Sequence, residues 1–262
     1  MLLESYDFDG RNMISAIMFD LDGTLVQTEK LKALSYAIAA QRLLAIPEPD
    51  NRAIEAYREI VGAARDVASR HIMDSLELEP ELSPLTNDYG VSEPWEVLTA
   101  MRTEIYDDMV ADPQVLRDNQ WPHTIELLRV ARETFCRTAL ATMSYRKEAL
   151  HVLESLNLEH YLDEILTRED VEQPKPDPEI YLLAARRLNV QPQDCLVLED
   201  SPNGVRAGVS AGMNVIAVAT PFTIAALHSS QVLEHAWVVH DSEKLVEVVR
   251  ERIAEHNRDG HS

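Results

Sequence analysis

Cysteine is scarce in this sequence, which has 262 residues and only two cysteines, Cys136 and Cys195. Each lies within an apolar run, so we expect two reduced, packed thiols rather than a disulfide framework or a cysteine-based metal site. No apolar run reaches the roughly 18 residues that a membrane-spanning helix requires. Residues 1–10 are acidic and lack the apolar stretch of a secretory signal. These features predict a cytoplasmic protein that has no membrane partner.

Positive charge is scarce as well. The sequence has 24 Lys and Arg residues against 45 Asp and Glu residues, a formal net charge of -21. The lysines are Lys30, Lys32, Lys147, Lys175 and Lys244. This balance argues against a nucleic-acid partner, and we interpret the acidity, which is spread along the chain, as a solvated surface. An anionic substrate would therefore require cations gathered at one place.

Short apolar runs alternate with helical patterns through most of the chain. The runs have the character of buried strands, and they occupy residues 14–19, 137–141, 195–198, 215–218 and 237–239. Apolar residues recur three and four positions apart, as in amphipathic helices, over residues 124–133, 146–157, 177–188, 203–211 and 242–254. This alternation predicts an α/β fold with a parallel sheet that helices cover on both faces.

One long segment interrupts the alternation. Residues 28–120 show helical periods only, with breaks at proline-containing stretches such as Pro47-Glu48-Pro49. We predict an all-helical cap domain of residues 28–120, inserted into an α/β core domain of residues 1–27 and 121–262. Because ligands of open α/β sheets bind beyond the carboxyl ends of the strands, an insert that leaves the first strand there is expected to act as a lid.

Two aspartates follow the first predicted strand, in Asp20-Leu21-Asp22-Gly23-Thr24. Residues two positions apart point in the same general direction, and Gly23 permits an unusual turn, so the two carboxyl groups can share one site. One carboxylate can attack phosphorus while the other protonates the departing oxygen. A helix-capping turn or a calcium loop are the alternatives, although a calcium loop would need Glu at its twelfth position. Residues 6–10 repeat the letters Asp-x-Asp-Gly without a preceding strand, and we interpret them as a solvated segment.

Polar residues also mark three later positions. Thr142 and Ser144 open a predicted helix, where hydroxyls and free amides can bind phosphate oxygens or simply cap the helix. Lys175 lies in a loop stiffened by three prolines, which favours a functional lysine over an ordinary surface one. Glu199 and Asp200 end a strand, and such a pair suits magnesium, which prefers oxygen ligands, or caps the next helix.

These motifs occur in a characteristic order. Asp-x-Asp-Gly-Thr, then Thr or Ser, then Lys, then an acidic pair, each closing a strand, resembles the haloacid dehalogenase superfamily over nearly the whole chain from Ile14. Residues 175–181 and 198–208 resemble its β-phosphoglucomutase-like subgroup. The resemblance implies a doubly wound core, a helical cap inserted after the first motif, and phosphoryl transfer through an aspartyl-phosphate.

The resemblance also implies roles for the residues of the core. Asp20 would be the nucleophile and Asp22 the general acid and base. Thr142 and Lys175 would hold the transferring phosphoryl oxygens, and Ser144 would assist them. The dehalogenases that named the superfamily lack the second aspartate, because a halide leaving group needs no proton. Asp22 therefore favours phosphate esters as substrates.

Magnesium is the cofactor that the resemblance implies. Its ligands would be Asp20, Glu199, Asp200 and the backbone carbonyl of Asp22. The metal and Lys175 would neutralise carboxylates and phosphate that otherwise repel one another, and would stabilise the charge of the transferring group.

Three cations of the predicted cap are candidates for substrate binding. Arg65 lies in residues 61–66, which resemble the specificity loop of the subgroup, and Arg102 roughly matches another cap cation of the sugar-phosphate mutases. Lys32 stands where such mutases carry a hinge histidine. We predict that Arg65, Arg102 and Lys32 bind the substrate, with Arg65 at its distal end.

The sequence thus predicts a magnesium-dependent phosphatase that hydrolyses a small phosphorylated metabolite. A sugar phosphomutase of the β-phosphoglucomutase type is an alternative, against which Lys32 and the replacement of a basic residue by Tyr145 count. A non-catalytic phosphate-binding or interaction module is an alternative of another class. The natural substrate and the oligomeric state are left open.

Overall fold

The computed structural model describes residues 14–133, 136–234 and 237–259, so the near-copy of the catalytic motif at residues 6–10 lies outside the described residues. The chain divides into two compact units. One runs to Val26 and resumes at Asn119, and the other spans Gln27–Asp118. None of the described helices combines the length and the apolar character that crossing a bilayer takes.

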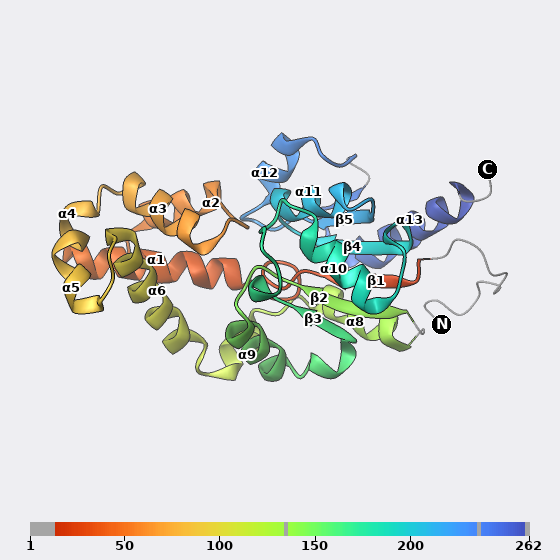
Figure 1. The fold of residues 1–262 in the computed structure, drawn as a ribbon, viewed down its shortest axis with the longest axis horizontal. Helices are drawn as coiled ribbons and strands as arrows, with labels where there is room; N and C mark the ends of the chain where they lie inside the picture. Colours follow the sequence, from red (N-terminus) through yellow and green to blue (C-terminus); the bar gives the residue numbers. More distant parts are fainter. Residues whose placement is uncertain (1–13, 134–135, 235–236, 260–262) are drawn as a thin grey trace. The chain divides into compact units, whose positions relative to one another are not determined.

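The first unit contains a six-stranded sheet in which neighbouring strands are parallel (Figure 1). Its strands are β1 (Ala16–Phe19), β2 (Arg137–Ala141), β3 (Glu164–Leu166), β4 (Cys195–Glu199), β5 (Asn214–Val218) and β6 (Val238–Val239). Their order is β3-β2-β1-β4-β5-β6, so the winding of the chain reverses between β1 and β4. The predicted doubly wound α/β fold is confirmed.

Helices cover both faces of this sheet. They are α8 (Pro122–Glu133), α9 (Arg146–Leu156), α10 (Glu179–Leu188), α11 (Pro202–Ser210), α12 (Ile224–Ser230) and α13 (Leu245–Asp259). Alternate strand residues such as Met18 and Val197 belong to one buried cluster with Tyr181 of α10 and Val205 of α11. On the other face, α8 contacts β1 and β2, and α13 contacts β5 (Figure 1). Because these central strands are buried on both faces, their sequences are continuous apolar runs.

Local sequence explains where several of these helices begin and end. Ser201 caps α11, because its Oγ accepts a hydrogen bond from the amide of Gly204 at 3.0 Å, and Pro202 occupies the first turn. Asn157 and Asn189 end α9 and α10 in the left-handed conformation, with φ values of 54° and 56°. These caps fix where α11 begins and where α9 and α10 end.

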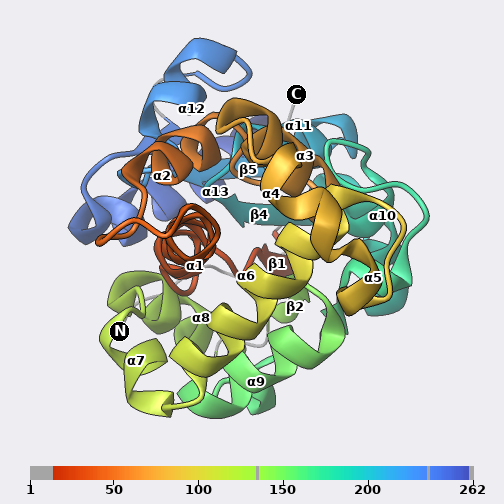
Figure 2. The same cartoon turned by 90° about the vertical axis from the view of Figure 1, so that its left-hand side faces the viewer.

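The second unit, every residue of which is described, has helices as its regular elements (Figure 2). They are α1 (Thr28–Leu44), α2 (Asn51–Glu59), α3 (Arg65–Ser75), α4 (Glu79–Leu82), α5 (Thr86–Tyr89), α6 (Pro94–Val110) and α7 (Pro113–Asp118), with a short 3-10 turn at Ser83–Leu85. The long helices α1 and α6 pack against each other, α2 packs on α1, and α3 packs on α6. The helical character of this segment agrees with its sequence pattern, and its role as a cap stays a prediction.

Two short elements of the core have no counterpart in the sequence prediction. Strand β3 has three residues, Glu164–Leu166, at one edge of the sheet, and this stretch is too short and too polar to form an apolar run. Helix α12 has seven residues, Ile224–Ser230, which is about two turns and gives little periodicity. Both elements depend on their packing against the sheet and its helices more than on local pattern.

Candidate active site

The candidate site lies where β1 and β4 end, which is the point at which the winding of the sheet reverses. Asp20 directly follows β1, and its backbone amide donates to the carbonyl of Leu198 in β4 at 3.0 Å. Asp200 directly follows β4. The side chains are buried, since Asp20 is 7% and Asp200 1% exposed. The carboxyl ends of parallel strands meet at one edge, so two aspartates far apart in sequence lie together there.

The turn after β1 depends on Gly23. Its φ of +87° is in the left-handed region that glycine adopts without strain, and its amide donates to the carbonyl of Val26 at 2.7 Å. A Cβ atom at this position would overlap the carboxylate of Asp200. Gly23 is therefore needed both for the turn that presents Asp22 and for the close approach of Asp200.

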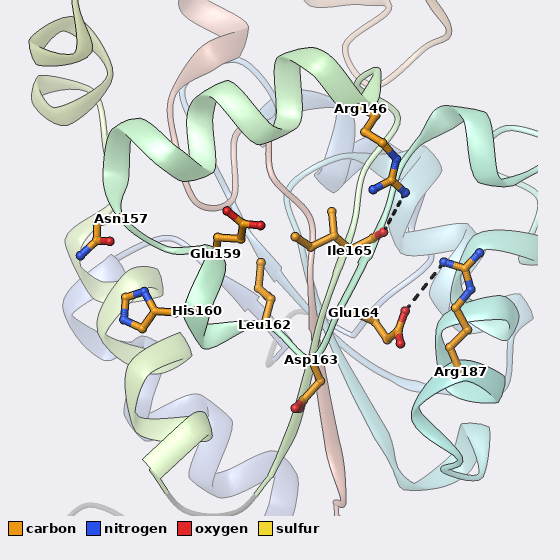
Figure 3. Close-up of a pocket in the computed structure, with 9 residues that line it drawn as sticks. All are labelled: Arg146, Asn157, Glu159, His160, Leu162, Asp163, Glu164, Ile165 and Arg187. Carbon is orange, nitrogen blue, oxygen red and sulfur yellow. Dashed lines mark hydrogen bonds and ion pairs between the residues drawn. The ribbon is translucent and has the colours of Figure 1, made fainter.

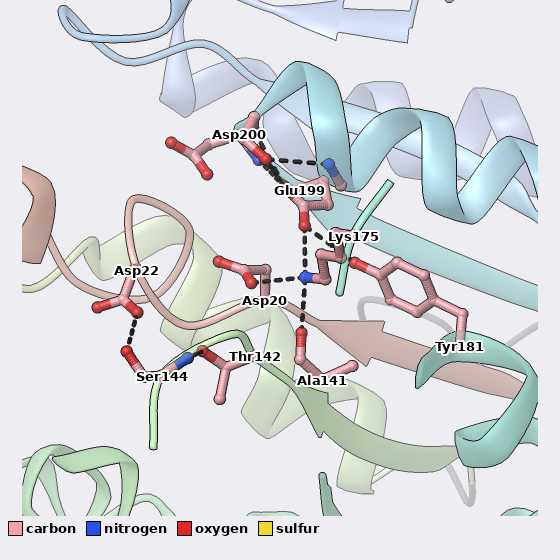
Figure 4. A network of polar contacts seen from close by, with 11 residues as sticks. Asp20, Asp22, Ala141, Thr142, Ser144, Lys175, Tyr181, Glu199 and Asp200 are labelled. Carbon is pink, nitrogen blue, oxygen red and sulfur yellow. Dashed lines mark hydrogen bonds and ion pairs between the residues drawn. The ribbon is translucent and has the colours of Figure 1, made fainter. Parts of the chain in front are cut away.

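The ammonium of Lys175 lies among the carboxylates at this edge of the sheet (Figure 4). Its Nζ donates to Oδ1 of Asp20 at 2.8 Å, to Oε1 of Glu199 at 2.6 Å and to the backbone carbonyl of Ala141 at 2.8 Å. Burial lowers the pKa of Lys175, but the carboxylates of Asp20 and Glu199 outweigh burial and hold that pKa well above its usual value. The buried ammonium therefore stays charged and joins the ends of β1, β2 and β4.

The surroundings of Asp20 favour the neutral, protonated form of its carboxyl group. Burial raises the pKa of Asp20 to about 8 in spite of the charge of Lys175, and the carboxylates of Glu199 and Asp22 add to the rise. Negative charge is thus in excess around the predicted nucleophile. A further cation beside Asp20 would lower this pKa and favour the ionised, nucleophilic form.

Thr142, Ser144 and Asp22 form a second polar group, after β2 and β1 (Figure 4). The hydroxyl of Ser144 donates to Oδ2 of Asp22 at 2.5 Å, and the amide of Ser144 donates to Oγ1 of Thr142 at 3.0 Å. The Thr142 hydroxyl accepts that bond and can still donate its own proton, for example to a phosphoryl oxygen. The Ser144 hydroxyl contacts the carboxyl group of the predicted acid and base, a contact that the sequence did not indicate, and its assistance in phosphate binding stays a prediction.

The carboxylate of Glu199 is surrounded by hydrogen-bond donors. Its Oε1 accepts from Lys175 and, at 3.0 Å, from the hydroxyl of Tyr181. Its Oε2 accepts from the amides of Asp200 and Ser201 at 2.9 and 3.0 Å and from the Ser201 hydroxyl at 3.1 Å. A carboxylate offers about four lone-pair positions, so these donors saturate it. Glu199 is therefore better suited to hold Lys175 than to bind a metal directly.

Three of the predicted metal ligands lie together. One carboxylate oxygen from each of Asp20, Glu199 and Asp200 lies within 4.8 Å of the others, and all three residues are buried. Buried carboxylates beside an excess of negative charge fit a hard divalent cation such as Mg2+. Because Glu199 is saturated by donors, the fit is strongest for Asp20 and Asp200. The backbone carbonyl of Asp22 stays a predicted ligand.

The three predicted substrate-binding cations belong to the second unit. Lys32 lies in α1 and is half-buried, and Arg65 is the first residue of α3, also half-buried. Arg102 in α6 is only 4% exposed, and its guanidinium lies over the rings of Tyr36 and Tyr106, 5.3 and 5.8 Å from their centroids. Arg102 is thus part of the interior of the helical unit rather than a solvated helix face. Substrate binding by these residues stays a prediction.

A hollow of about 700 Å³ in the first unit contains none of the predicted site residues (Figure 3). It is lined by Arg146, Asn157, Glu159, His160, Leu162, Asp163, Glu164, Ile165 and Arg187. Beside it, the guanidinium of Arg146 donates to the carbonyl of Ile165 in the edge strand β3 at 3.2 Å. The hollow therefore flanks the edge strand β3, and the carboxylates that follow β1 and β4 do not line it.

Sequence reasoning missed two residues that shape the site. Tyr181 has the spacing of an ordinary apolar position of α10, and only the buried contact of its hydroxyl with Glu199 shows another role. Gly204 was visible in the segment after Asp200, but a Cβ atom there would overlap the Glu199 carboxylate. Nothing in the linear pattern indicates which glycine of the segment faces a carboxylate.

The chain is similar to known proteins both in sequence and in fold. The model of the haloacid dehalogenase-like hydrolases matches residues 14–212, a range that includes Asp20 and Asp200. The chain is 32% identical over 203 residues to the phosphorylated carbohydrates phosphatase of Thermotoga maritima, covering 78% of this chain and 84% of that one. It is 28% identical to the 6-phosphogluconate phosphatase of Escherichia coli, covering 77% and 81%. The solved β-phosphoglucomutase of Clostridium difficile has the same fold, with a TM-score of 0.70, 23% identity and coverage of 93% and 99%.

Proposed function

The chain belongs to the haloacid dehalogenase-like hydrolases, and on this premise we propose that it is a magnesium-dependent phosphatase of a small phosphorylated carbohydrate. The observation that carries the proposal is the buried contact of Lys175 with Asp20, at 2.8 Å, beside Asp200 and Thr142. A carboxylate held by a fixed ammonium, next to a hydroxyl donor and an acidic pair, is suited to accept a phosphoryl group.

The first half of the proposed reaction forms an aspartyl-phosphate on Asp20. A carboxylate oxygen of Asp20 attacks phosphorus, and the bond from phosphorus to the ester oxygen breaks. The carboxyl group of Asp22, oriented by Ser144, gives its proton to the departing alcohol. Lys175 and the Thr142 hydroxyl donate hydrogen bonds to the oxygens of the transferring group, where charge accumulates.

The second half returns the enzyme to its starting state. The carboxylate of Asp22 takes a proton from water, whose oxygen attacks phosphorus. The bond between phosphorus and Asp20 breaks, which releases inorganic phosphate and regenerates the Asp20 carboxylate. Asp22 is again protonated, so one residue serves as acid in the first half and as base in the second.

Magnesium would be held by the carboxylates of Asp20 and Asp200, which the geometry favours over Glu199 for direct contact. When bound, the ion supplies positive charge that offsets the repulsion between the Asp20 carboxylate and the phosphate dianion. Burial, together with the neighbouring carboxylates of Glu199 and Asp22, raises the pKa of Asp20 to about 8, and the charge of such an ion would lower it.

The proposed substrate class follows from the relatives. The relative that is 32% identical is named for phosphorylated carbohydrates, and another is named for 6-phosphogluconate. The similarity to the β-phosphoglucomutase of Clostridium difficile, at 23% identity, concerns the fold alone. Because the two curated relatives are named as phosphatases, water is the proposed acceptor of the phosphoryl group. Transfer to a second sugar hydroxyl is the alternative, which a solved putative β-phosphoglucomutase of Thermotoga maritima, 28% identical, supports.

A phosphate-release assay tests the proposal. The purified protein with Mg2+ should release inorganic phosphate from at least one member of a panel of sugar phosphates and 6-phosphogluconate, and Asp20→Asn should abolish the release. Asp7→Asn, the same change in the near-copy of the motif, is the matched control and should retain activity.

The same assay separates the alternatives. Isomerisation of a hexose 1-phosphate that depends on a sugar bisphosphate, without net phosphate release, would indicate a phosphomutase. A folded protein that does neither but binds phosphate would indicate a non-catalytic module.

A further inference from the structure

Tyr181 lies against the catalytic lysine, yet neither the sequence motifs nor the proposed function gives it a role. Its ring is fully buried in the cluster between α10 and the sheet. Its hydroxyl donates to Oε1 of Glu199 at 3.0 Å, the same oxygen that accepts from Lys175 at 2.6 Å (Figure 4). The ring face is also close to the ammonium, with Nζ of Lys175 4.9 Å from the ring centroid. Tyr181 thus contacts both members of a buried ion pair.

The hydrogen bonds of Lys175 are all in use. An ammonium has three N–H donors, and these go to Asp20, Ala141 and Glu199. Lys175 can therefore donate to a phosphoryl oxygen only if one present acceptor gives up its bond. An acceptor that has no other donor would be left buried and unsatisfied, which is costly. Oε1 of Glu199 is the acceptor that has a replacement, because the Tyr181 hydroxyl already donates to it.

The carboxylate of Glu199 cannot move together with the ammonium of Lys175. Its Oε2 is fixed by the amides of Asp200 and Ser201 and by the Ser201 hydroxyl. The backbone of Gly204 lies so close to the carboxylate that a Cβ atom there would overlap it. Because the carboxylate is held from these sides, the partner that can change its bonding is the flexible lysine side chain.

We propose that Tyr181 is a positioning residue for phosphoryl transfer, which keeps Glu199 hydrogen-bonded while Lys175 turns one N–H from Glu199 to the transferring phosphoryl group. The ring face adds a favourable surface for the ammonium throughout this exchange. The inference rests on the proposed function, since it assigns Lys175 to the phosphoryl oxygens. It adds that the strength of this contact is set by a tyrosine that does not touch the substrate.

Tyr181→Phe tests the inference, because it removes the hydroxyl and keeps the buried ring. We expect kcat/KM for p-nitrophenyl phosphate to fall roughly tenfold, the size of one lost hydrogen bond to a charged group. The affinity for orthovanadate, measured calorimetrically with Mg2+, should weaken by a similar factor. Tyr161→Phe is the matched control, since Tyr161 lies in a 3-10 turn outside the site, and it should leave both quantities unchanged.

A double-mutant cycle distinguishes positioning from a general loss of stability. If Tyr181 acts through Lys175, Tyr181→Phe should change vanadate affinity less than about twofold when Lys175→Met is already present. Glu199→Gln provides a second background, in which the effect of Tyr181→Phe should shrink in the same way. Equal effects in all backgrounds, or no effect of Tyr181→Phe on an active enzyme, would overturn the inference.

Failure of the proposed function has a different signature. In that case the wild-type protein would hydrolyse no phosphomonoester, while vanadate binding in the same cycle would still decide the role of Tyr181. Additive losses of vanadate affinity would reject the positioning role, and a loss confined to the chain with Lys175 would support it.

Discussion

The hydroxyl of Ser144 lies 2.5 Å from Oδ2 of Asp22, although 122 residues separate the two in the chain. The position of Ser144 is fixed by its own backbone, whose amide donates to Thr142 and whose carbonyl accepts from the amide of Arg168 at 3.1 Å. The proposed proton donor is therefore oriented by the same short segment that offers a hydroxyl to the phosphoryl oxygens.

Ser144→Ala tests this orientation. The substitution leaves the Asp22 carboxyl without the hydroxyl that holds it, so we expect kcat to fall roughly tenfold, about 1.4 kcal/mol, with little change in KM. Steady-state kinetics with a phosphomonoester measures both constants. Ser210→Ala, an exposed position at the end of α11, is the control and should match the wild type. A Ser144→Ala enzyme with unchanged kcat would contradict the orienting role.

Magnesium dependence should separate Asp200 from Glu199. Asp200→Asn removes a proposed ligand charge, so we expect the Mg2+ concentration for half-maximal activity to rise at least about tenfold, in line with lost ligand affinity. Glu199→Gln should shift this concentration much less, because donors already saturate both carboxylate oxygens. Magnesium titrations of the two variants give the comparison. An equal or larger shift for Glu199→Gln would identify Glu199 as a direct ligand.

Stability without metal should fall as the pH rises. Burial raises the pKa of Asp20 from 3.8 to about 8, so between these values the folded protein holds a proton that the unfolded chain has released. The folded state then binds more protons, and the free energy of unfolding decreases with increasing pH. In EDTA we expect the melting temperature to drop by more than roughly 2–4 °C between pH 5 and pH 8, which corresponds to about 1 kcal/mol.

Two controls accompany this measurement. Asp20→Asn should flatten the dependence, because the amide has no proton to lose. Mg2+ should restore the melting temperature at pH 8, since it binds the ionised carboxylates of the folded state. A wild-type melting temperature that rises from pH 5 to pH 8 in EDTA, and rises less in Asp20→Asn, would show that the pKa of Asp20 is lowered instead.

Asp170 should have the opposite pH dependence. Its carboxylate accepts from the amide and hydroxyl of Thr167 at 2.9 and 3.0 Å, and from Arg146 and Arg187 at 2.9 and 3.0 Å. Although burial opposes them, these donors lower the pKa of Asp170 to about 2. Its contribution is therefore present at neutral pH and is lost as the pH falls through about 2.

Asp170→Asn measures this contribution. At pH 7 we expect the free energy of unfolding to fall by about 1–3 kcal/mol, as for a partly buried group that loses charged hydrogen bonds. The difference from the wild type should shrink as denaturation is followed to pH 3 and below. Glu172→Gln, an exposed carboxylate in the following loop, is the control and should change stability little. A pH-independent difference for Asp170→Asn would contradict the lowered pKa.

The grouping of the candidate site residues could be predicted from the sequence because a parallel sheet imposes a simple rule. Polar residues at the carboxyl ends of β1, β2 and β4 meet at one edge whatever their separation in the chain. Asp20, Thr142 and Asp200 are such residues, and Lys175 reaches them from a loop whose prolines were visible. The alternation of apolar runs and helical periods likewise indicated a parallel sheet covered on both faces, and the family resemblance added the doubly wound order, which the strand order confirms.

Interactions that depend on packing across the sheet were not predictable. Tyr181 has the spacing of a core residue, and its hydroxyl gains significance only because Glu199 lies opposite. The contact of Ser144 with Asp22 requires the turn at Gly23, whose path a linear pattern does not specify. Strand β3 is recognisable only through its pairing with β2.

The ammonium of Lys175 also has a consequence for how sequences of this kind are compared. It lies between the carboxylates of Asp20 and Glu199 and binds a main-chain oxygen of β2, so removing it would leave acidic groups repelling one another in the interior. A descendant that had lost its substrate would be expected to retain this lysine for as long as the acidic pair remained, because folding alone selects for it. The presence of the lysine in a related chain is therefore evidence of a shared fold. Catalytic activity has to be judged instead from the residues that correspond to Asp22 and Ser144.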